Sequence, residues 1–294
     1  MERADIAIVG SGPAGVSAAI NARIRHKSFY LFGAAELSDK VRRAERISNY
    51  PGLPDVSGTE LNRRLMYHLE QARISITQKR ITGIYNMGDY FTLLADTEEF
   101  EAASVILATG VESLSAVKGE RELLGRGVSY CATCDGNLYR GRSIAVVCDN
   151  ASMEHEVEYL AGLAEKVYYC PLFKQSVLSG ANTEIMTSPI AKIDGDDRVS
   201  GITCRDGREI TLDGVFFLKQ SVSPAVLLRG LAMNIGHVEV KRDMSTNIEG
   251  CFAAGDCTGD PYQIAKAVGE GNIAAHSAFA WLARRTEKQG GAKL

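Results

Sequence analysis

The feature that most constrains the fold is a short apolar run followed by a glycine-rich hexapeptide. The run Ile6-Ala7-Ile8-Val9 is typical of a strand buried on both faces of a parallel sheet. A helix is predicted over residues 14–24 and a second strand over 29–32. Between the first strand and the helix, glycines permit a tight turn, close approach of backbone to a pyrophosphate, and close helix–strand packing; the hexapeptide is Gly10, Ser11, Gly12, Pro13, Ala14, Gly15. The sequence therefore predicts an α/β nucleotide-binding domain.

The second strand lacks the acidic residue that usually follows it and binds the ribose hydroxyls of a dinucleotide. The position is Phe32-Gly33, and the nearest carboxylate is that of Glu36. We therefore expect the adenosine end of the nucleotide to be held by other groups.

Length and composition bound the class of protein. A chain of 294 residues, 45% of them hydrophobic, predicts two domains. The acidic start leads straight into a predicted strand, unlike a signal peptide, and no apolar stretch reaches membrane-spanning length. Seven cysteines, an odd number, favour reduced thiols over a secreted disulfide framework. These features predict a soluble cytoplasmic protein with no membrane partner.

Charge is uneven along the chain. The net charge of −3 gives no indication of nucleic-acid binding. Residues 21–80, however, contain twelve Lys or Arg against six Asp or Glu. The simpler interpretation of this excess is an ordinary solvent-exposed surface. The more specific one is a docking surface for an acidic partner.

Cys131 and Cys134 have the spacing of a redox-active pair, Cys-Ala-Thr-Cys. In such a turn the sulfurs can bond, and a helix N-terminus lowers the pKa of a thiol so that its thiolate can attack another disulfide. A zinc half-site is the alternative, but zinc prefers four ligands and no second CxxC or His pair accompanies this one. The pair predicts redox chemistry and no metal site. Cys251 and Cys257, which flank the Gly255-Asp256 turn, could form a second redox couple, but buried small hydrophobes are the simpler interpretation of both, and of Cys148, Cys170 and Cys204.

Two more predicted strands, within 105–110 and 250–256, end in glycine turns. Together with Asn49-Tyr50-Pro51-Gly52 and Gln263-Ile264, they make the chain resemble the low-molecular-weight thioredoxin reductases over most of its length. That resemblance implies bound FAD, with the Asp256 carboxylate on the ribitol. The implied contacts are Gly10, Ser11, Gly12, Pro13, Ala14, Gly15, Asn49, Ala108, Thr109, Gly110, Gly255, Asp256, Gln263 and Ile264.

The resemblance also implies the domain layout. We expect two Rossmann-like, three-layer nucleotide-binding domains, the second inserted into the first. Residues 1–113 and 242–294 would form the FAD-binding domain. Residues 114–241 would form an inserted redox domain, similar to an NAD(P)H domain, that carries the CxxC pair. The family further implies a homodimer, and hinges near the two crossings at Leu114 and Arg242.

Catalytic roles follow from the same resemblance. Cys134 would face the flavin, and Cys131 would attack the disulfide of thioredoxin. Asp135 would act as general acid and base toward the thiol near the flavin.

A second nucleotide site looks degenerate. A predicted strand over 143–147 is followed by Cys148-Asp149-Asn150-Ala151-Ser152, where the family has glycines that seat the NADPH pyrophosphate. Asp149 adds a charge of the same sign as the phosphates. Residues 169–173 contain no cation before Lys174, and the strand within 215–220 lacks the family's glycine ending. NADPH binding is therefore not expected.

The implied function is FAD-dependent reduction of thioredoxin with electrons from ferredoxin, because the chain is most similar to the ferredoxin-dependent flavin thioredoxin reductases. Basic residues over 40–46 agree with this, and Arg42, Arg43 and Arg46 are the predicted docking residues. Two alternatives stay open: an NAD(P)H-dependent disulfide reductase with an atypical cofactor site, and a non-enzymatic flavin redox sensor.

Overall fold

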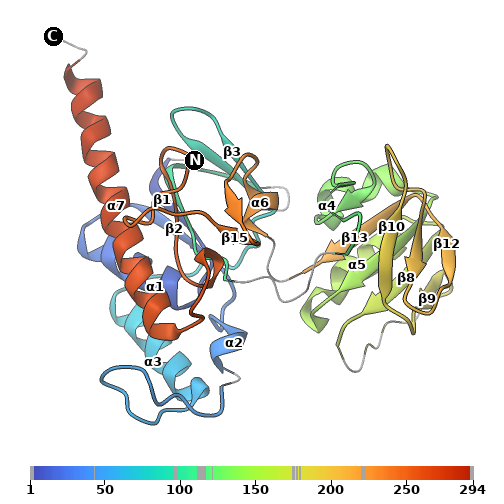
Figure 1. Ribbon diagram of the computed structural model, residues 1–294, viewed down its shortest axis with the longest axis horizontal. Helices are drawn as coiled ribbons and strands as arrows, with labels where there is room; N and C mark the ends of the chain where they lie inside the picture. The colour runs from blue at the N-terminus through green and yellow to red at the C-terminus, as the bar shows by residue number, and fades with distance from the viewer. Residues whose placement is uncertain are drawn as a thin grey trace. The chain divides into compact units, whose positions relative to one another are not determined.

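The computed structural model describes residues 3–42, 44–95, 98–110, 117–120, 122–173, 176, 178, 180–219 and 223–291. The chain divides into two compact units (Figure 1): Met1–Val111 with Ser223–Leu294, and Glu112–Val222. It returns to the first unit at Ser223 rather than at Arg242, because residues 223–241 pack with that unit. Both units combine sheets and helices, so the predicted α/β class is confirmed.

A six-stranded sheet forms the centre of the first unit. Its order is β2-β1-β5-β4-β3, and β16 pairs with the second half of β5. The pairs β1–β2, β1–β5 and β5–β16 are parallel, whereas β3–β4 and β4–β5 are antiparallel. The strands are β1 (Ala4–Val9), β2 (Phe29–Phe32), β3 (Gly83–Asn86), β4 (Phe91–Ala95), β5 (Glu98–Leu107) and β16 (Cys251–Ala253). The apolar run and the strand at 29–32 thus pair as the sequence predicted.

Two helices pack together beside this sheet, α1 (Pro13–Ile24) and the long α7 (Ile264–Gly291), as Figure 1 shows. They approach so closely that a Cβ on Gly271 would lie 2.1 Å from the carbonyl oxygen of Ala14. The unit also contains α2 (Asp39–Arg42), α3 (Gly58–Gln71), α6 (Pro224–Leu227), η3 (Asp256–Thr258) and the hairpin β14 (Met233–Asn234) and β15 (His237–Val238). Among the described residues, no helix combines the length and apolar character needed to cross a membrane.

The second unit has a fully parallel sheet in the order β6-β13-β7-β8-β9 and an antiparallel sheet β10-β11-β12. The parallel strands are β6 (Val128–Ser129), β13 (Gly214–Leu218), β7 (Ser143–Cys148), β8 (Lys166–Pro171) and β9 (Thr183–Ile185). The remaining elements are α4 (Ala132–Asp135), η1 (Gly136–Tyr139), η2 (Ala151–Met153), α5 (Glu154–Ala161), β10 (Ile190–Asp194), β11 (Gly201–Cys204) and β12 (Glu209–Thr211). The strand order reverses between β7 and β13, and α/β folds bind ligands at such a switch point.

Candidate functional site

The residues predicted to bind a nucleotide meet at the carboxyl edge of the first sheet. Gly10 follows β1, Ala108 follows β5 and Gly255 lies two residues beyond β16, and these strands are neighbours. The Ala108 N–H donates to the Val9 carbonyl at 2.8 Å, and the Ala254 N–H donates to the Leu107 carbonyl at 2.9 Å. Parallel strands bring their carboxyl ends to one edge, so three turns far apart in sequence lie side by side.

Glycines at this edge form a cradle that larger residues would fill. Gly10 has a φ of +117°, and a Cβ there would lie 2.1 Å from the Ala108 carbonyl oxygen. A Cβ on Gly15 would lie 1.8 Å from the Gly10 carbonyl oxygen. Gly12, the N-cap of α1, has nothing within 4 Å of its Cβ direction, and Pro13 begins the helix. Open space before a helix N-terminus suits the pyrophosphate of a dinucleotide, so the residues present fit such a cofactor.

The turn that carries Asp256 is supported by two charged residues of α7. The Lys266 ammonium donates to the carbonyl oxygens of Gly255 at 2.9 Å and Gly259 at 2.6 Å. One Glu270 carboxylate oxygen accepts from the Gly255 N–H and the Thr258 hydroxyl, both at 2.8 Å. These contacts fix the half-buried Asp256 at the sheet edge. This role of Lys266 was not predictable from local sequence, because a lysine near the start of a helix is usually solvated.

A further contact joins two segments predicted to touch the flavin. The Asn49 side-chain amide donates to the Gln263 side-chain oxygen at 2.6 Å, across 214 positions of sequence. The next residue, Ile264, packs against the apolar cluster of Val41, Ile47, Val56 and Leu61. The loop at 49–52 is therefore tied to the first turn of α7.

The missing acidic residue after β2 has a steric explanation. A Cβ on Gly33 would lie 2.1 Å from the Ser11 hydroxyl oxygen, and that hydroxyl donates to the Ala34 carbonyl at 3.2 Å. Ser11 thus occupies the space that a longer side chain at position 33 would need. Glu36, the nearest carboxylate in sequence, is exposed and pairs with Arg42 at 3.1 Å.

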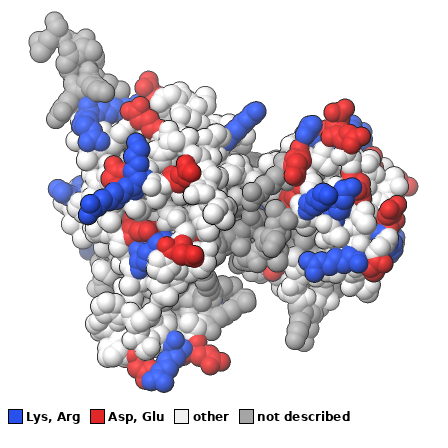
Figure 2. Space-filling view, in the orientation of Figure 1, with Lys and Arg blue, Asp and Glu red and all other residues white. Residues whose placement is uncertain are grey.

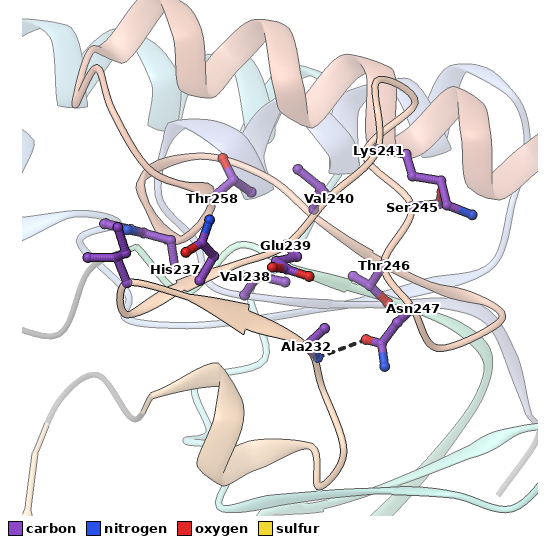
Figure 3. Close-up of a pocket in the computed structure, with 12 residues that line it drawn as sticks. Ala232, His237, Val238, Glu239, Val240, Lys241, Ser245, Thr246, Asn247 and Thr258 are labelled. Carbon is purple, nitrogen blue, oxygen red and sulfur yellow. Dashed lines mark hydrogen bonds between the residues drawn. The ribbon is translucent and has the colours of Figure 1, made fainter.

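A pocket of about 570 Å³ also lies in the first unit, and Thr258 of η3 is among the residues that line it. Figure 3 shows the hairpin residues His237 and Val238 on one side and Thr246 and Asn247 on the other. The Ala232 N–H donates to the Asn247 side-chain oxygen at 2.8 Å. The pocket lining includes none of the residues predicted to bind the nucleotide.

The predicted redox pair in the second unit is a disulfide, with 5.4 Å between the Cα atoms of Cys131 and Cys134. Cys131 is the N-cap of α4, and its sulfur accepts from the Cys134 N–H at 3.1 Å. A backbone donor aimed at a sulfur favours its thiolate after reduction. Cys131 is only 7% exposed, whereas Cys134 is exposed. Hydrogen bonding therefore favours Cys131 as the nucleophile, and accessibility in this structure favours Cys134.

Ser129 organises the surroundings of the pair. Its hydroxyl donates to an Asp135 carboxylate oxygen at 2.7 Å and accepts from the Cys131 N–H at 3.0 Å. Asp135, next in sequence to Cys134, is thereby held in a fixed orientation, as a proton donor and acceptor requires. Within the described ranges, no group of three or more His, Cys, Asp or Glu residues could hold a metal ion.

The loop after β7 is held by hydrogen bonds among its own residues. The Asn150 side-chain oxygen accepts from the Ser152 N–H at 2.9 Å, and the Cys148 thiol donates to the Asn150 carbonyl at 3.2 Å. Helix α5 then begins with carboxylates, because Glu154 and Glu156 lie in its first turn. Carboxylates there interact favourably with the positive end of the helix and repel a phosphate.

Glu154 is also bound internally, since one of its oxygens accepts from the Tyr169 hydroxyl at 2.9 Å and the Ser176 hydroxyl at 2.6 Å. Burial and this carboxylate raise the pKa of Tyr169, which therefore stays protonated. Lys174, the first cation after this strand, lies outside the described residues.

The five remaining cysteines are buried, as predicted. Burial raises the pKa of Cys148 and Cys257 to about 11 and that of Cys251 to about 12, and it also raises the pKa of Cys170.

We therefore expect the reduced native protein at pH 7–8 to take up two alkyl groups quickly, on Cys131 and Cys134. The other five cysteines are shielded by burial and should react only after denaturation. Mass spectrometry of peptides after timed iodoacetamide labelling measures this. Rapid labelling of Cys251 or Cys257 in the native protein would contradict the assignment of a single redox pair.

The predicted docking arginines have partners within their own unit. Arg42 pairs with Glu36 and Arg46 pairs with Asp55, while Arg43 lies outside the described residues. On the face shown in Figure 2, acidic and basic side chains are interspersed. Exposed pairs of this kind are weak, so a partner's carboxylates can replace Glu36 and Asp55 at small cost.

Comparison with known proteins places these features in context. The model of the pyridine nucleotide-disulphide oxidoreductase family matches residues 4–147 and 175–271. A thioredoxin reductase from Helicobacter pylori is 32% identical, with 95% of this chain and 98% of that protein covered. One from Bacillus subtilis is 31% identical, with 93% of each covered. A solved ferredoxin-flavin thioredoxin reductase from Clostridium acetobutylicum is 48% identical, with a TM-score of 0.89, and 97% of this chain and 99% of that chain are covered.

Proposed function

Because this chain belongs to the pyridine nucleotide-disulphide oxidoreductase family, we propose that it is a thioredoxin reductase that uses FAD and takes its electrons from ferredoxin. The proposal rests on one combination of features. The glycine cradle of the first unit and the redox disulfide are intact, whereas Asn150 and Glu154 stand at the switch point of the second unit. Similar proteins support both thioredoxin as the acceptor and ferredoxin as the donor.

The cofactor would lie on the carboxyl edge of the first sheet. Gly12 and the start of α1 would receive the pyrophosphate, Asp256 the ribitol, and Asn49 with Gln263 the flavin end. When bound, FAD supplies the electron pair that reduces a disulfide. The chain's own residues do the rest: they hold the cofactor, orient the cysteines and move protons.

Reduction of the Cys131–Cys134 bond adds two electrons and yields two sulfur atoms that are thiol or thiolate. The Cys131 thiolate, stabilised by the Cys134 N–H, attacks one sulfur of the thioredoxin disulfide and releases the other as a thiolate. Cys134 then attacks Cys131, which re-forms the internal disulfide and releases reduced thioredoxin. Asp135, oriented by Ser129, would take the proton from Cys134 as it becomes the nucleophile.

The donor assignment rests on the second unit. A phosphate near the N-terminus of α5 would meet the carboxylates of Glu154 and Glu156. Asp149, in the loop directly after β7, adds another charge of the same sign as the phosphate. A protein donor does not need this site. The arginines Arg42 and Arg46, with Arg43 between them in sequence, are the proposed contact with an acidic ferredoxin.

The test is the anaerobic absorbance of the purified protein mixed separately with reduced ferredoxin, NADPH and NADH. Ferredoxin should bleach the flavin band, and each nicotinamide should act at least about a hundredfold more slowly, equivalent to ~3 kcal/mol of lost stabilisation. Oxidised thioredoxin added to the ferredoxin-reduced sample should then gain two thiols.

Each other outcome selects one of the alternatives. Rapid bleaching by NADPH would identify an NAD(P)H-dependent disulfide reductase with an atypical cofactor site. Bleaching by chemical reductant but by no biological carrier would favour a flavin redox sensor. A homodimeric assembly and a cytoplasmic location stay predictions.

A further inference from the structure

The second unit contains a fully buried ion pair that the proposed reaction does not use. The Lys219 ammonium lies 2.6 Å from a Glu120 carboxylate oxygen, and these side chains are 2% and 0% exposed. The ammonium also lies 4.7 Å from the ring centroid of Phe217 and 5.7 Å from that of Tyr130. Lysine and glutamate are almost never this buried unless they are paired.

Tyr130 completes the cluster. Its hydroxyl donates to the same Glu120 oxygen at 2.5 Å, and the Val117 N–H donates to the other oxygen at 2.8 Å. Glu120, Tyr130 and Lys219 therefore form a hydrogen-bonded set, called here the buried triad. The amino-acid sequence carries one sign of this set, because Lys219 directly follows a five-residue apolar strand.

The triad lies at a particular place in the chain. Glu120 is close in sequence to the first passage between the units, at Val111/Glu112, and Lys219 to the second, at Val222/Ser223. Tyr130 immediately precedes Cys131. The triad thus joins three segments of one unit: the one entering it, the one leaving it and the one that carries the redox disulfide.

Two simpler interpretations fit less well. Lys219 follows β13 at the switch point, where a cation could bind a phosphate, but its ammonium is bound by Glu120 and withdrawn from solvent. A purely stabilising role is also weakly supported, because burying two charges costs desolvation energy that the attraction often only offsets. A role in positioning the redox turn accounts for the hydrogen bond between Glu120 and Tyr130, the residue before Cys131.

We propose that Glu120 and Lys219 are positioning residues, which act through Tyr130 to hold Cys131 beside Cys134 after the disulfide is reduced. Ser129 anchors the turn from one side, through the Cys131 N–H and Asp135, and Tyr130 anchors it from the other. The inference deepens the proposed disulfide-reductase function and rests on it.

The direction of the effect follows from effective concentration. Two thiols held close together re-form their bond more favourably than two thiols on a loosened turn. Cutting the link between the triad and Cys131 should therefore shift the thiol–disulfide equilibrium toward the dithiol. If the triad acted on the cysteines through its charges alone, loss of Lys219 would disfavour their thiolates, whereas loss of Glu120 would favour them.

The experiment equilibrates the flavin-loaded protein anaerobically with graded ratios of reduced and oxidised glutathione, then counts free thiols by alkylation and mass spectrometry. The variants are Tyr130→Phe, which leaves the ion pair in place, and the double variant Glu120→Leu/Lys219→Met, which replaces the pair by apolar groups. Both should shift the equilibrium constant toward the dithiol by about tenfold, equal to about 30 mV for a two-electron couple.

Tyr169→Phe is the matched control, because it removes another hydroxyl that donates to a carboxylate in the same unit, that of Glu154. It should leave the equilibrium constant within about twofold of wild type. Thermal unfolding of each variant separates stability from redox behaviour. A lowered melting temperature with an unchanged equilibrium constant in both triad variants would overturn the proposal and leave the triad a structural element. Neither ferredoxin nor thioredoxin is present, so failure of the proposed donor or acceptor cannot produce that result.

Discussion

Serine in place of either Cys131 or Cys134 is expected to lower the rate of protein disulfide reduction by on the order of a thousandfold or more, because a single thiol cannot complete the exchange. Binding of flavin should be unaffected, since the glycine cradle belongs to the other unit. Steady-state assays with thioredoxin, together with the flavin absorbance of each variant, measure the two effects separately.

The same variants decide which sulfur attacks the substrate. If Cys131 is the nucleophile, Cys134→Ser should accumulate a mixed disulfide with thioredoxin, visible as a shifted band on non-reducing gels. Cys131→Ser should accumulate none. The opposite pattern would show that exposure of Cys134 outweighs the hydrogen bond that its N–H donates to Cys131. Cys204→Ala, at a buried cysteine of the same unit, is the control and should retain activity.

Alanine at Gly15 should yield a protein that loses FAD and is markedly less stable. The added Cβ would lie 1.8 Å from the Gly10 carbonyl oxygen. Neither atom can rotate away, because the backbone fixes the position of a Cβ and the oxygen is itself a backbone atom. Overpacking of this kind costs about 1–3 kcal/mol, and the same displacement separates α1 from β1 at the phosphate site. A misfit of ~2 kcal/mol there corresponds to roughly thirtyfold weaker cofactor binding. Flavin content after dialysis and the thermal melting curve report the two effects.

Gly12→Ala separates cofactor contact from packing. Nothing lies within 4 Å of its added Cβ, so the apoprotein should fold with near-normal stability. Its affinity for FAD should nevertheless fall, because the methyl group would point into the space proposed for the pyrophosphate. Gly162→Ala, whose Cβ would make only contacts of 3.4 Å or more, should change neither property. Normal FAD binding by Gly12→Ala would place the pyrophosphate elsewhere.

Local patterns in the sequence were enough to predict the first βαβ unit and the pairing of Cys131 with Cys134, because neighbouring residues determine strands, glycine turns and a CxxC turn. Contacts that depend on the tertiary fold were not predictable in this way. Asn49 and Gln263 meet across 214 positions, and Glu120 and Lys219 meet across 99. A lone lysine or glutamate carries no sign of its partner until the strands are assembled.

The position at which the chain returns to the first unit, Ser223, was likewise not predictable from local sequence patterns. Residues 223–241 contain only short elements, α6, β14 and β15, and so lack a periodic pattern that would assign them to either unit. Their packing is decided by contacts such as the bond from the Ala232 N–H to Asn247. A boundary set by such contacts is visible only in the folded chain.

The hydrogen bonds that Glu154 accepts affect how a nicotinamide site could arise in such a protein. Glycines restored over residues 148–150 would leave its carboxylate in the first turn of α5, bonded to Tyr169 and Ser176. Removing Glu154 first would leave the hydroxyls of the buried Tyr169 and the half-buried Ser176 without this acceptor, and would bring no new ligand in return. A nicotinamide site at this switch point would therefore require several coordinated substitutions, and the first of them alone would cost stability.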